Sequence, residues 1–158
     1  MTATFGARNE LTTVGVVGLG GTGLPLALAL ADAGTLTTGL DIDRTKIAAL
    51  RLGESYLPHV STAALEATAE WFEPTWDPTR LAGLDTYIIC VPVPFRADGA
   101  ADLRHVLRAA DVLGPLLRPG SAVEVRSTVP PGAITLLAAR LADGSGLRPG
   151  VDFRISGA

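Results

Sequence analysis

The sequence predicts an α/β domain in which helices cover both faces of a doubly wound parallel sheet. Three observations support this fold class. Short apolar segments alternate along the chain with segments of helical periodicity. A glycine-rich turn joins the first apolar segment to the first helical one. Apolar residues make up 47% of the chain and aromatic residues only 5%, a balance that suits helices packed on a buried parallel sheet.

The glycine-rich turn, residues 18–23, reads GLGGTG and follows the apolar segment that begins at Thr13. Gly18 permits a tight exit from a buried strand, and Gly20 lets a pyrophosphate approach the backbone. Gly23 lets the following helix lie close to the sheet. Amides at the start of a helix lack intrahelical partners, and together with the helix dipole they can hold phosphate groups. The turn therefore predicts a dinucleotide site.

An acidic residue follows the second apolar segment at the distance that ribose recognition requires. Asp41 lies 18 residues after Gly23, where its carboxylate can accept hydrogen bonds from both hydroxyls of an adenine ribose. A carboxylate there disfavours a 2′-phosphate, so the pattern predicts NAD rather than NADP. Glycine-rich turns also occur in flavin and S-adenosylmethionine proteins, or simply make a tight turn. The preceding strand, the following helix and Asp41 together favour a dinucleotide.

Six apolar segments are expected as strands of the sheet. They lie at residues 13–18, 36–40, 71–74, 86–91, 122–125 and 151–155. The fourth segment is apolar throughout, as a central strand buried on both faces would be, and Pro92 ends it. Alternation with helices gives the strand order 3-2-1-4-5-6 of a Rossmann fold, with the ligand crevice beyond the carboxyl ends of strands 1 and 4.

Helical segments connect these strands. We expect helices at residues 22–33, 43–52, 62–70, 102–117 and 133–142. Gly34 and Gly53 follow the first two helices, as C-terminal glycines often do. Asp43, Ser61 and Asp102 stand where an N-cap side chain would accept a backbone hydrogen bond.

Length, charge and cysteine content limit the classes of protein to which the chain can belong. The 158 residues fit one domain, expected at residues 13–158 after a flexible N-terminus at residues 1–12. A net charge of -3 argues against a nucleic-acid partner. No apolar run is long enough to span a membrane, and residues 1–12 do not resemble a signal peptide, so we expect a cytoplasmic protein. The single cysteine, Cys90, excludes an internal disulfide, and no Cys/His cluster has metal-ligand spacing.

With these segments placed, the chain resembles the NAD-binding domain of the nucleotide-sugar 6-dehydrogenases, the UDP-glucose and UDP-N-acetylmannosamine dehydrogenase family. Five stretches carry the resemblance: VGVVGLGGTGLPLALALADAG, GLDIDRTKIAAL, ALRLGESYLP, YIICVPVPFRADGAADLRHV and VRSTVPPG. They are spaced along most of residues 13–155. The resemblance implies an oxidoreductase that uses NAD to convert the C6 alcohol of a UDP-sugar to a carboxylate, a step in polysaccharide biosynthesis.

The resemblance also implies roles for individual residues. The glycine-rich turn would hold the pyrophosphate, and Asp41 the adenosine ribose, with Arg44 or Lys46 beside it. Thr128 would be an auxiliary catalytic residue that helps to arrange the reacting centre and its water, or an N-cap of the last helix, or both. The complete predicted cofactor site is Gly18, Gly20, Gly21, Thr22, Gly23, Asp41, Arg44, Lys46, Val91, Pro92, Ser127 and Thr128.

Several positions depart from the family pattern. Gly21 and Thr22 stand where the family usually has Tyr and Val, so a packing contact beside the pyrophosphate is lost. Val93 replaces a threonine that could bond the cofactor, and Arg126 replaces a glutamate often found before Ser-Thr. Because a lost hydrogen bond costs about 0.5 to 1.5 kcal/mol, we expect up to about tenfold weaker NAD binding.

The largest departure concerns the catalytic machinery. In this family a cysteine that forms a thioester, and the sugar-binding segments, lie in domains that follow the sixth strand and are absent from this sequence. Cys90 does not replace that cysteine, because we expect it inside strand 4 as a small buried residue.

The chain is therefore either the cofactor domain of a dehydrogenase, cut from a longer chain or completed by a partner polypeptide, or a stand-alone NAD-binding protein without dehydrogenase activity. Expected partners are thus a dinucleotide and either a catalytic polypeptide or a second copy of the chain. A short-chain oxidoreductase of the hydroxyacid type is a third reading, disfavoured by STVPPG and by the VPVP loop.

Overall fold

A six-stranded parallel sheet with the order β3-β2-β1-β4-β5-β6 forms the centre of the molecule. The computed structural model describes residues 12–157, so the predicted flexible N-terminus lies outside the described residues except for Thr12. This topology confirms the predicted doubly wound fold. The strands are β1 Thr13–Val17, β2 Leu36–Leu40, β3 Phe72–Thr75, β4 Thr86–Ile89, β5 Ala122–Val125 and β6 Arg154–Gly157.

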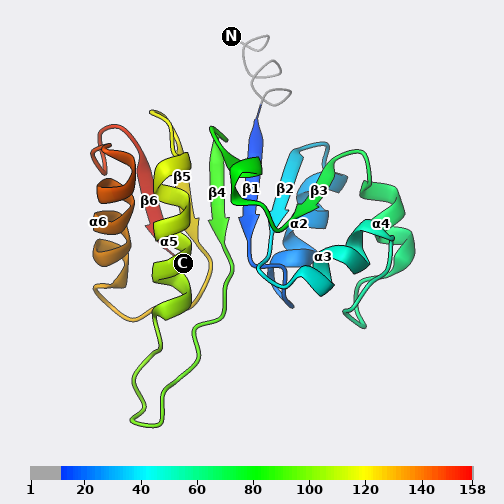
Figure 1. Cartoon of the computed structure of the whole chain (residues 1–158), viewed down its shortest axis with the longest axis horizontal. Coiled ribbons are helices and arrows are strands. Elements are labelled where there is room, and N and C mark those ends of the chain that lie inside the picture. The colour runs from blue at the N-terminus through cyan, green and yellow to red at the C-terminus, as the bar shows by residue number, and fades with distance from the viewer. Residues whose placement is uncertain (1–11, 158) are drawn as a thin grey trace.

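Helices from the two halves of the chain gather over the two halves of the sheet, as Figure 1 shows, with α2, α3 and α4 around β2 and β3 and with α5 and α6 around β5 and β6. The helices are α2 Gly23–Asp32, α3 Arg44–Arg51, α4 Thr62–Thr68, α5 Arg104–Leu113 and α6 Ala133–Ser145. Two short 3₁₀ turns, η1 Pro78–Leu81 and η2 Gly114–Leu116, complete the list.

Alternation of side chains along the central strands divides the core in two. On β4, Tyr87 and Ile89 pack in the cluster formed with α5 and α6, whereas Ile88 packs in the cluster formed with α2, α3 and α4. On β1, Val16 and Val17 separate in the same way. Successive strand residues point to opposite faces, so these central strands are apolar on both faces, as the unbroken apolar run at β4 predicts.

Side-chain caps fix where α3 and α4 begin. The Asp43 carboxylate accepts hydrogen bonds from the backbone N–H groups of Thr45 and Lys46, at 2.9 and 3.4 Å. The Ser61 hydroxyl accepts one from Ala64 at 3.1 Å. Both predicted N-caps are therefore confirmed. The first three predicted helices agree with α2, α3 and α4 to within two residues at each end.

Several other predicted boundaries were wrong. Helix α5 ends at Leu113 rather than at 117, since Pro115 lies in the next turn and has no amide hydrogen to donate. Asp102 accepts a hydrogen bond from Arg104 N–H at 3.0 Å, but Leu103 is the N-cap. Helix α6 continues to Ser145 instead of 142, with Gly144 packed closely on Gly114.

The sixth strand was predicted three residues too early and is Arg154–Gly157 instead of 151–155. The apolar residues at 151 and 153 suggested a strand, but Gly150 adopts a positive φ of 80°. The N–H groups of Val151 and Asp152 both bond Arg148 O, at 3.2 and 2.8 Å, and close a turn. Strands β1 and β4 also end one and two residues earlier than predicted.

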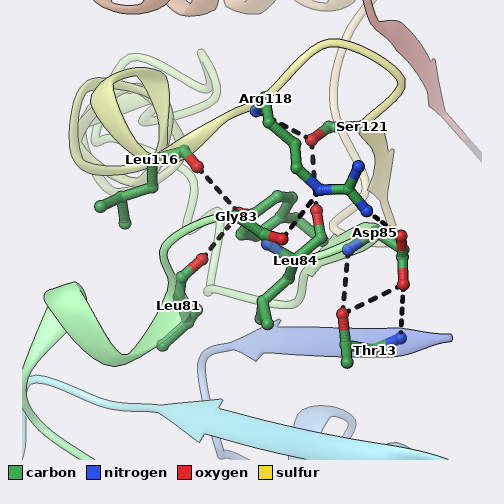
Figure 2. A network of polar contacts seen from close by, with 9 residues as sticks. Thr13, Leu81, Gly83, Leu84, Asp85, Leu116, Arg118 and Ser121 are labelled. Atoms are coloured by element: carbon green, nitrogen blue, oxygen red, sulfur yellow. Dashed lines mark hydrogen bonds and ion pairs between the residues drawn. The ribbon is translucent and has the colours of Figure 1, made fainter. Parts of the chain in front are cut away.

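A polar network closes the amino-terminal edge of the sheet (Figure 2). The Asp85 carboxylate accepts hydrogen bonds from Thr13 N–H at 2.8 Å and from the Thr13 hydroxyl at 3.2 Å, and it pairs with the Arg118 guanidinium. Arg118 Nε also donates to Gly83 O at 2.9 Å. The network joins the start of β1 to the connections on either side of β4, so its role is to hold strands in register.

Tyr87 belongs to the same edge. Its side chain is fully buried, and its hydroxyl donates to Leu81 O at 2.6 Å and accepts from Leu84 N–H at 3.0 Å. Burial raises the pKa of Tyr87 above its ordinary value, so the hydroxyl stays protonated at neutral pH. Within residues 12–157, no buried side-chain nitrogen or oxygen lacks a hydrogen-bond partner.

Candidate functional site

A cleft of about 700 Å³ opens at the carboxyl-terminal edge of the sheet, between β1 and β4, where the strand order reverses. Its volume lies in the range of small-molecule sites. Backbone and side chains from both halves of the chain line it. The lining residues are Val17, Gly18, Gly20, Gly21, Thr22, Leu40, Asp41, Ile42, Asp43, Lys46, Cys90, Val91, Pro92, Val93, His105, Arg108, Ala109, Val112, Arg126, Ser127 and Thr128.

Two glycines of the turn are required by the backbone itself. Gly18 adopts a φ of +95°, and a Cβ there would lie 3.0 Å from the Cys90 carbonyl. A Cβ on Gly23 would lie 1.7 Å from Gly18 O. This distance is too short for any residue with a side chain to fit. These two positions therefore bring the start of α2 against β1 and leave the N-terminal end of the helix facing the cleft.

The other two glycines leave room for a ligand. A Cβ on Gly20 or Gly21 would meet no atom within 4 Å, and both residues line the cleft. In the part of the chain that the structure describes, the backbone N–H groups of Gly20, Gly21 and Thr22 have no hydrogen-bond partner. Free amides beside open space at a helix N-terminus suit an anionic group such as a pyrophosphate.

Asp41 lies at the end of β2, on one side of this turn. One of its oxygens accepts a hydrogen bond from Leu19 N–H at 2.9 Å, and the other accepts one from Asp43 N–H at 2.8 Å. The side chain remains 11% exposed and faces the cleft. Since each carboxylate oxygen carries two lone pairs, both oxygens can still accept a hydrogen bond from a ligand hydroxyl.

The cations near Asp41 do not all face the cleft. Lys46 lines it, with its ammonium nitrogen 4.0 Å from the Asp41 carboxylate. Arg44 does not line it, because its guanidinium lies over the ring of Trp76, 5.2 Å from the ring centre. Arg51 also lies over the same ring, at 4.2 Å. Of the two cations that the sequence left open, Lys46 is therefore the one that lies beside Asp41 in the cleft.

Asp43, which caps α3, also lines the cleft. Its hydrogen bond with the Thr45 hydroxyl, at 2.5 Å, is the largest cause that holds the pKa of Asp43 below its usual value. The side chain is therefore ionised at neutral pH. Asp43 was predicted as an N-cap and not as a site residue, although its spacing of two residues from Asp41 could have placed it at the same edge.

The opposite end of the cleft is formed by the loops after β4 and β5. Val91, Pro92, Ser127 and Thr128 all lie there, as predicted. The Ser127 hydroxyl donates to Val91 O at 2.6 Å and so joins the two loops. Thr128 is exposed and lines the cleft, but the N-cap of α6 is Gly132, with no side-chain hydrogen bond. The predicted capping role of Thr128 was wrong.

Positive charge gathers at this second end. Arg126 and Arg108 line the cleft, and His105 lies one turn before Arg108 on α5. Arg126 also pairs with Glu124 at 2.6 Å, but no acidic residue lines this end among the described residues. His105 and Arg108 were not predicted as site residues. Their spacing of three residues, which places both on one helix face, was the available signal.

Cys90 lies just beyond β4, not inside the strand as predicted, and its half-buried side chain lines the cleft. Burial raises the pKa of the Cys90 thiol to about 11, against the opposing effect of Arg126. The thiol is therefore protonated at neutral pH and a weak nucleophile. The expected buried position was wrong, because the side chain is only half-buried and lines the cleft.

Neither a metal-binding cluster nor a membrane-spanning helix is found among the described residues. Within residues 12–157, no group of three or more His, Cys, Asp or Glu side chains is arranged to hold a metal ion. No helix in that part of the chain has the length and apolar character needed to cross a membrane.

Comparison with known proteins identifies similar chains. Residues 12–157 match the family model described as UDP-glucose/GDP-mannose dehydrogenase family, NAD binding domain. UDP-N-acetyl-D-mannosamine dehydrogenase of Salmonella typhi is 34% identical over 147 residues, which cover 91% of this chain and 34% of the relative.

Among solved structures, the UDP-D-ManNAc dehydrogenase of Pyrococcus horikoshii superimposes with a TM-score of 0.87 at 31% identity, covering 93% of this chain and 36% of that one. A ternary complex of GDP-mannose dehydrogenase from Pseudomonas aeruginosa superimposes with a TM-score of 0.84 at 29% identity, covering 91% of this chain and 35% of that one. The chain thus spans about a third of the length of the relatives that it matches.

Proposed function

The chain belongs to the UDP-glucose/GDP-mannose dehydrogenase family, as its NAD-binding domain, and we propose that it serves as the cofactor domain of a nucleotide-sugar 6-dehydrogenase. Oxidation of a sugar C6 alcohol to a carboxylate then requires a catalytic domain, on a longer chain or on a partner polypeptide, since this chain spans about a third of its relatives. We further propose a cytoplasmic location and a role in polysaccharide biosynthesis.

The observation that carries this proposal is the cleft at the reversal point of the sheet. Its middle presents the unpartnered amides of Gly20, Gly21 and Thr22, and no side chain fills the space above the two glycines. One end presents Asp41, which still has two lone pairs free after its two backbone hydrogen bonds. The residues present therefore fit a dinucleotide with a free ribose 2′-hydroxyl, which is NAD.

In this proposal each part of the cleft holds one part of NAD. The turn holds the pyrophosphate, with Gly18 and Gly23 setting its shape, and Asp41 accepts the adenosine ribose hydroxyls with Lys46 beside it. The loops after β4 and β5 enclose the nicotinamide end. That end is formed by Val91, Pro92, Ser127 and Thr128.

When bound, NAD supplies the hydride acceptor for the oxidation. The chain's own residues bind and orient. The hydrogen bond from Ser127 to Val91 O fixes the two loops relative to each other. The exposed Thr128 hydroxyl is available to hold a water or a substrate group there. It is therefore an auxiliary residue, and the groups that would take a proton from a sugar hydroxyl must come from another domain.

Activity measurements test the proposal. We expect the purified chain to produce no NADH when UDP-glucose or UDP-N-acetylmannosamine is added with NAD, because hydride transfer needs an oriented substrate and the chain spans only about a third of the length of its relatives. Addition of the catalytic region that follows the NAD-binding domain in a relative should restore NADH production if the two parts assemble. Turnover by the isolated chain would contradict the need for a further domain. Absence of turnover with any catalytic region would favour a stand-alone NAD-binding protein.

A further inference from the structure

Tyr56 contacts the glycine-rich turn from outside the cleft. It lies in the connection between α3 and α4, and its hydroxyl donates a hydrogen bond to Leu19 O at 2.5 Å. Tyr56 does not line the cleft itself. The two residues are separated by 37 positions in the sequence, so this contact ties a distant segment to the turn that faces the ligand.

Leu19 is held at three points as a result. Its N–H donates to Asp41 at 2.9 Å, its carbonyl accepts from Tyr56, and its side chain is fully buried. The side chain packs over Gly39, where a Cβ would lie only 2.8 Å from Leu19 Cδ2. The backbone at Leu19 is therefore fixed before any ligand binds.

The fixed carbonyl determines where the next amide points. Leu19 C=O and Gly20 N–H belong to one planar trans peptide group and point in opposite directions. Because the carbonyl points to Tyr56, outside the cleft, the Gly20 N–H points the other way, and Gly20 lines the cleft. Glycine has unusual backbone freedom. Without the hydrogen bond from Tyr56, the Leu19–Gly20 peptide group would therefore be weakly restrained on its Gly20 side.

The electrostatic surroundings keep Tyr56 in its donor form. Its half-buried position raises the pKa of the phenol well above its ordinary value, and the negative charges of Asp41 and Asp43 raise it further. The hydroxyl is thus protonated at neutral pH. The Lys46 ammonium lies 5.5 Å from the centre of the Tyr56 ring and 4.0 Å from Asp41, so Tyr56 also supports the cation at the ribose end.

We propose that Tyr56 is a positioning residue for the dinucleotide, whose hydroxyl orients the Leu19–Gly20 peptide so that Gly20 N–H faces the pyrophosphate. This inference rests on the proposed NAD site and adds to it a residue outside the cleft. A purely structural role would lower stability without a selective effect on phosphate binding, so the two roles can be separated by measurement.

Tyr56→Phe removes only the hydroxyl and is the direct test. We expect about twofold to tenfold weaker binding of NAD and of ADP-ribose in calorimetry, the range for one lost hydrogen bond. Binding of adenosine, which has no phosphate, should be unchanged when followed by ligand-observed NMR. In ¹⁵N-labelled protein without ligand, the Gly20 amide resonance should shift or broaden in the variant.

Tyr87→Phe is the matched control, because it removes a buried tyrosine hydroxyl that donates to Leu81 O at the opposite edge of the sheet. It should lower the melting temperature and leave NAD affinity unchanged. Wild-type affinity in Tyr56→Phe, or an equal loss for adenosine and ADP-ribose, would overturn the positioning role. If Tyr56→Phe did not fold, hydrogen exchange of the Gly20 amide would be followed instead in the wild type and in Tyr87→Phe under partly unfolding conditions. A Gly20 exchange rate that stayed unchanged there would also count against the positioning role. Failure of the wild type to bind NAD would instead overturn the proposed function.

Discussion

Asp85 and Asp41 stand at opposite edges of the same sheet and differ in what their surroundings leave free. At the amino edge, Asp85 accepts two hydrogen bonds from Thr13 and pairs with Arg118. At the carboxyl edge, Asp41 accepts two backbone hydrogen bonds and has Lys46 only at 4.0 Å. One carboxylate is engaged by side chains from neighbouring elements, whereas the other faces a cleft.

The backbone shows the same contrast. At the amino edge, the carbonyls of Leu81, Gly83 and Leu84 all accept side-chain hydrogen bonds (Figure 2). At the carboxyl edge, the amides of Gly20 and Gly21 have no partner in the described part of the chain. A parallel sheet thus has one edge whose polar groups stabilise the fold and one edge whose polar groups remain available to a ligand.

Replacement of Asp41 should have the largest effect on binding. Asp41→Ala removes two hydrogen bonds to a charged acceptor, so NAD affinity should fall by about 30-fold to 100-fold, while the already weak NADP binding should change little. The preference for NAD should then disappear. Calorimetric titration with both cofactors measures this, with a melting curve to confirm the fold. A variant that keeps the wild-type preference would break the assignment of Asp41 to the ribose.

The corresponding change at the other edge should affect stability alone. Asp85→Ala removes the acceptor for Thr13 and the partner of Arg118, so the free energy of unfolding should fall by about 2 to 3 kcal/mol. For a domain of this size the melting temperature should drop by roughly 5 to 10 °C. Below that temperature, NAD affinity should match the wild type within about twofold. A tenfold weaker affinity in folded protein would show that the two edges are not independent.

A charge change at Arg126, in the end of the cleft that we assign to the nicotinamide, should have a smaller effect on cofactor binding. The oxidised ring carries a positive charge and the reduced ring does not, so Arg126 should disfavour NAD⁺ relative to NADH. Arg126→Glu should lower the ratio of the dissociation constants for NAD⁺ and NADH by about twofold to fivefold at low salt. Fluorescence titration of NADH, with NAD⁺ as competitor, measures the ratio.

Arg140→Glu gives a control of equal charge change. Arg140 lies on α6, pairs with Asp111 at 2.8 Å and does not line the cleft, so the ratio should stay at its wild-type value. A ratio that shifts equally in both variants would point to net charge alone. A ratio that rises in Arg126→Glu would contradict the assignment of this end.

The sequence predicted those features of the site that depend on local chemistry. Gly18 and Gly23 were identified because a tight turn and a close helix require glycine, and Asp41 because it ends an apolar strand at a fixed distance from the turn. Lys46 was predicted, but only the structure separates it from Arg44, whose stacking on Trp76 depends on how β3 packs beside α3.

Features of the site that depend on contacts between segments far apart in the sequence could not be predicted in the same way. Tyr56 reaches Leu19 across 37 positions and belongs to no motif. His105 and Arg108 enter the cleft only because α5 starts at the carboxyl edge. The sixth strand was misplaced since an apolar pattern at 151–153 does not reveal that Gly150 turns the chain with a positive φ.

The central claim is that the unpartnered amides of the glycine-rich turn and the Asp41 carboxylate together form an NAD site. Calorimetric titration of the folded wild-type chain with NAD and with NADP tests it most directly. We predict one NAD per chain, bound at least about tenfold more tightly than NADP. No binding of either cofactor, or equal binding of both, would contradict the account.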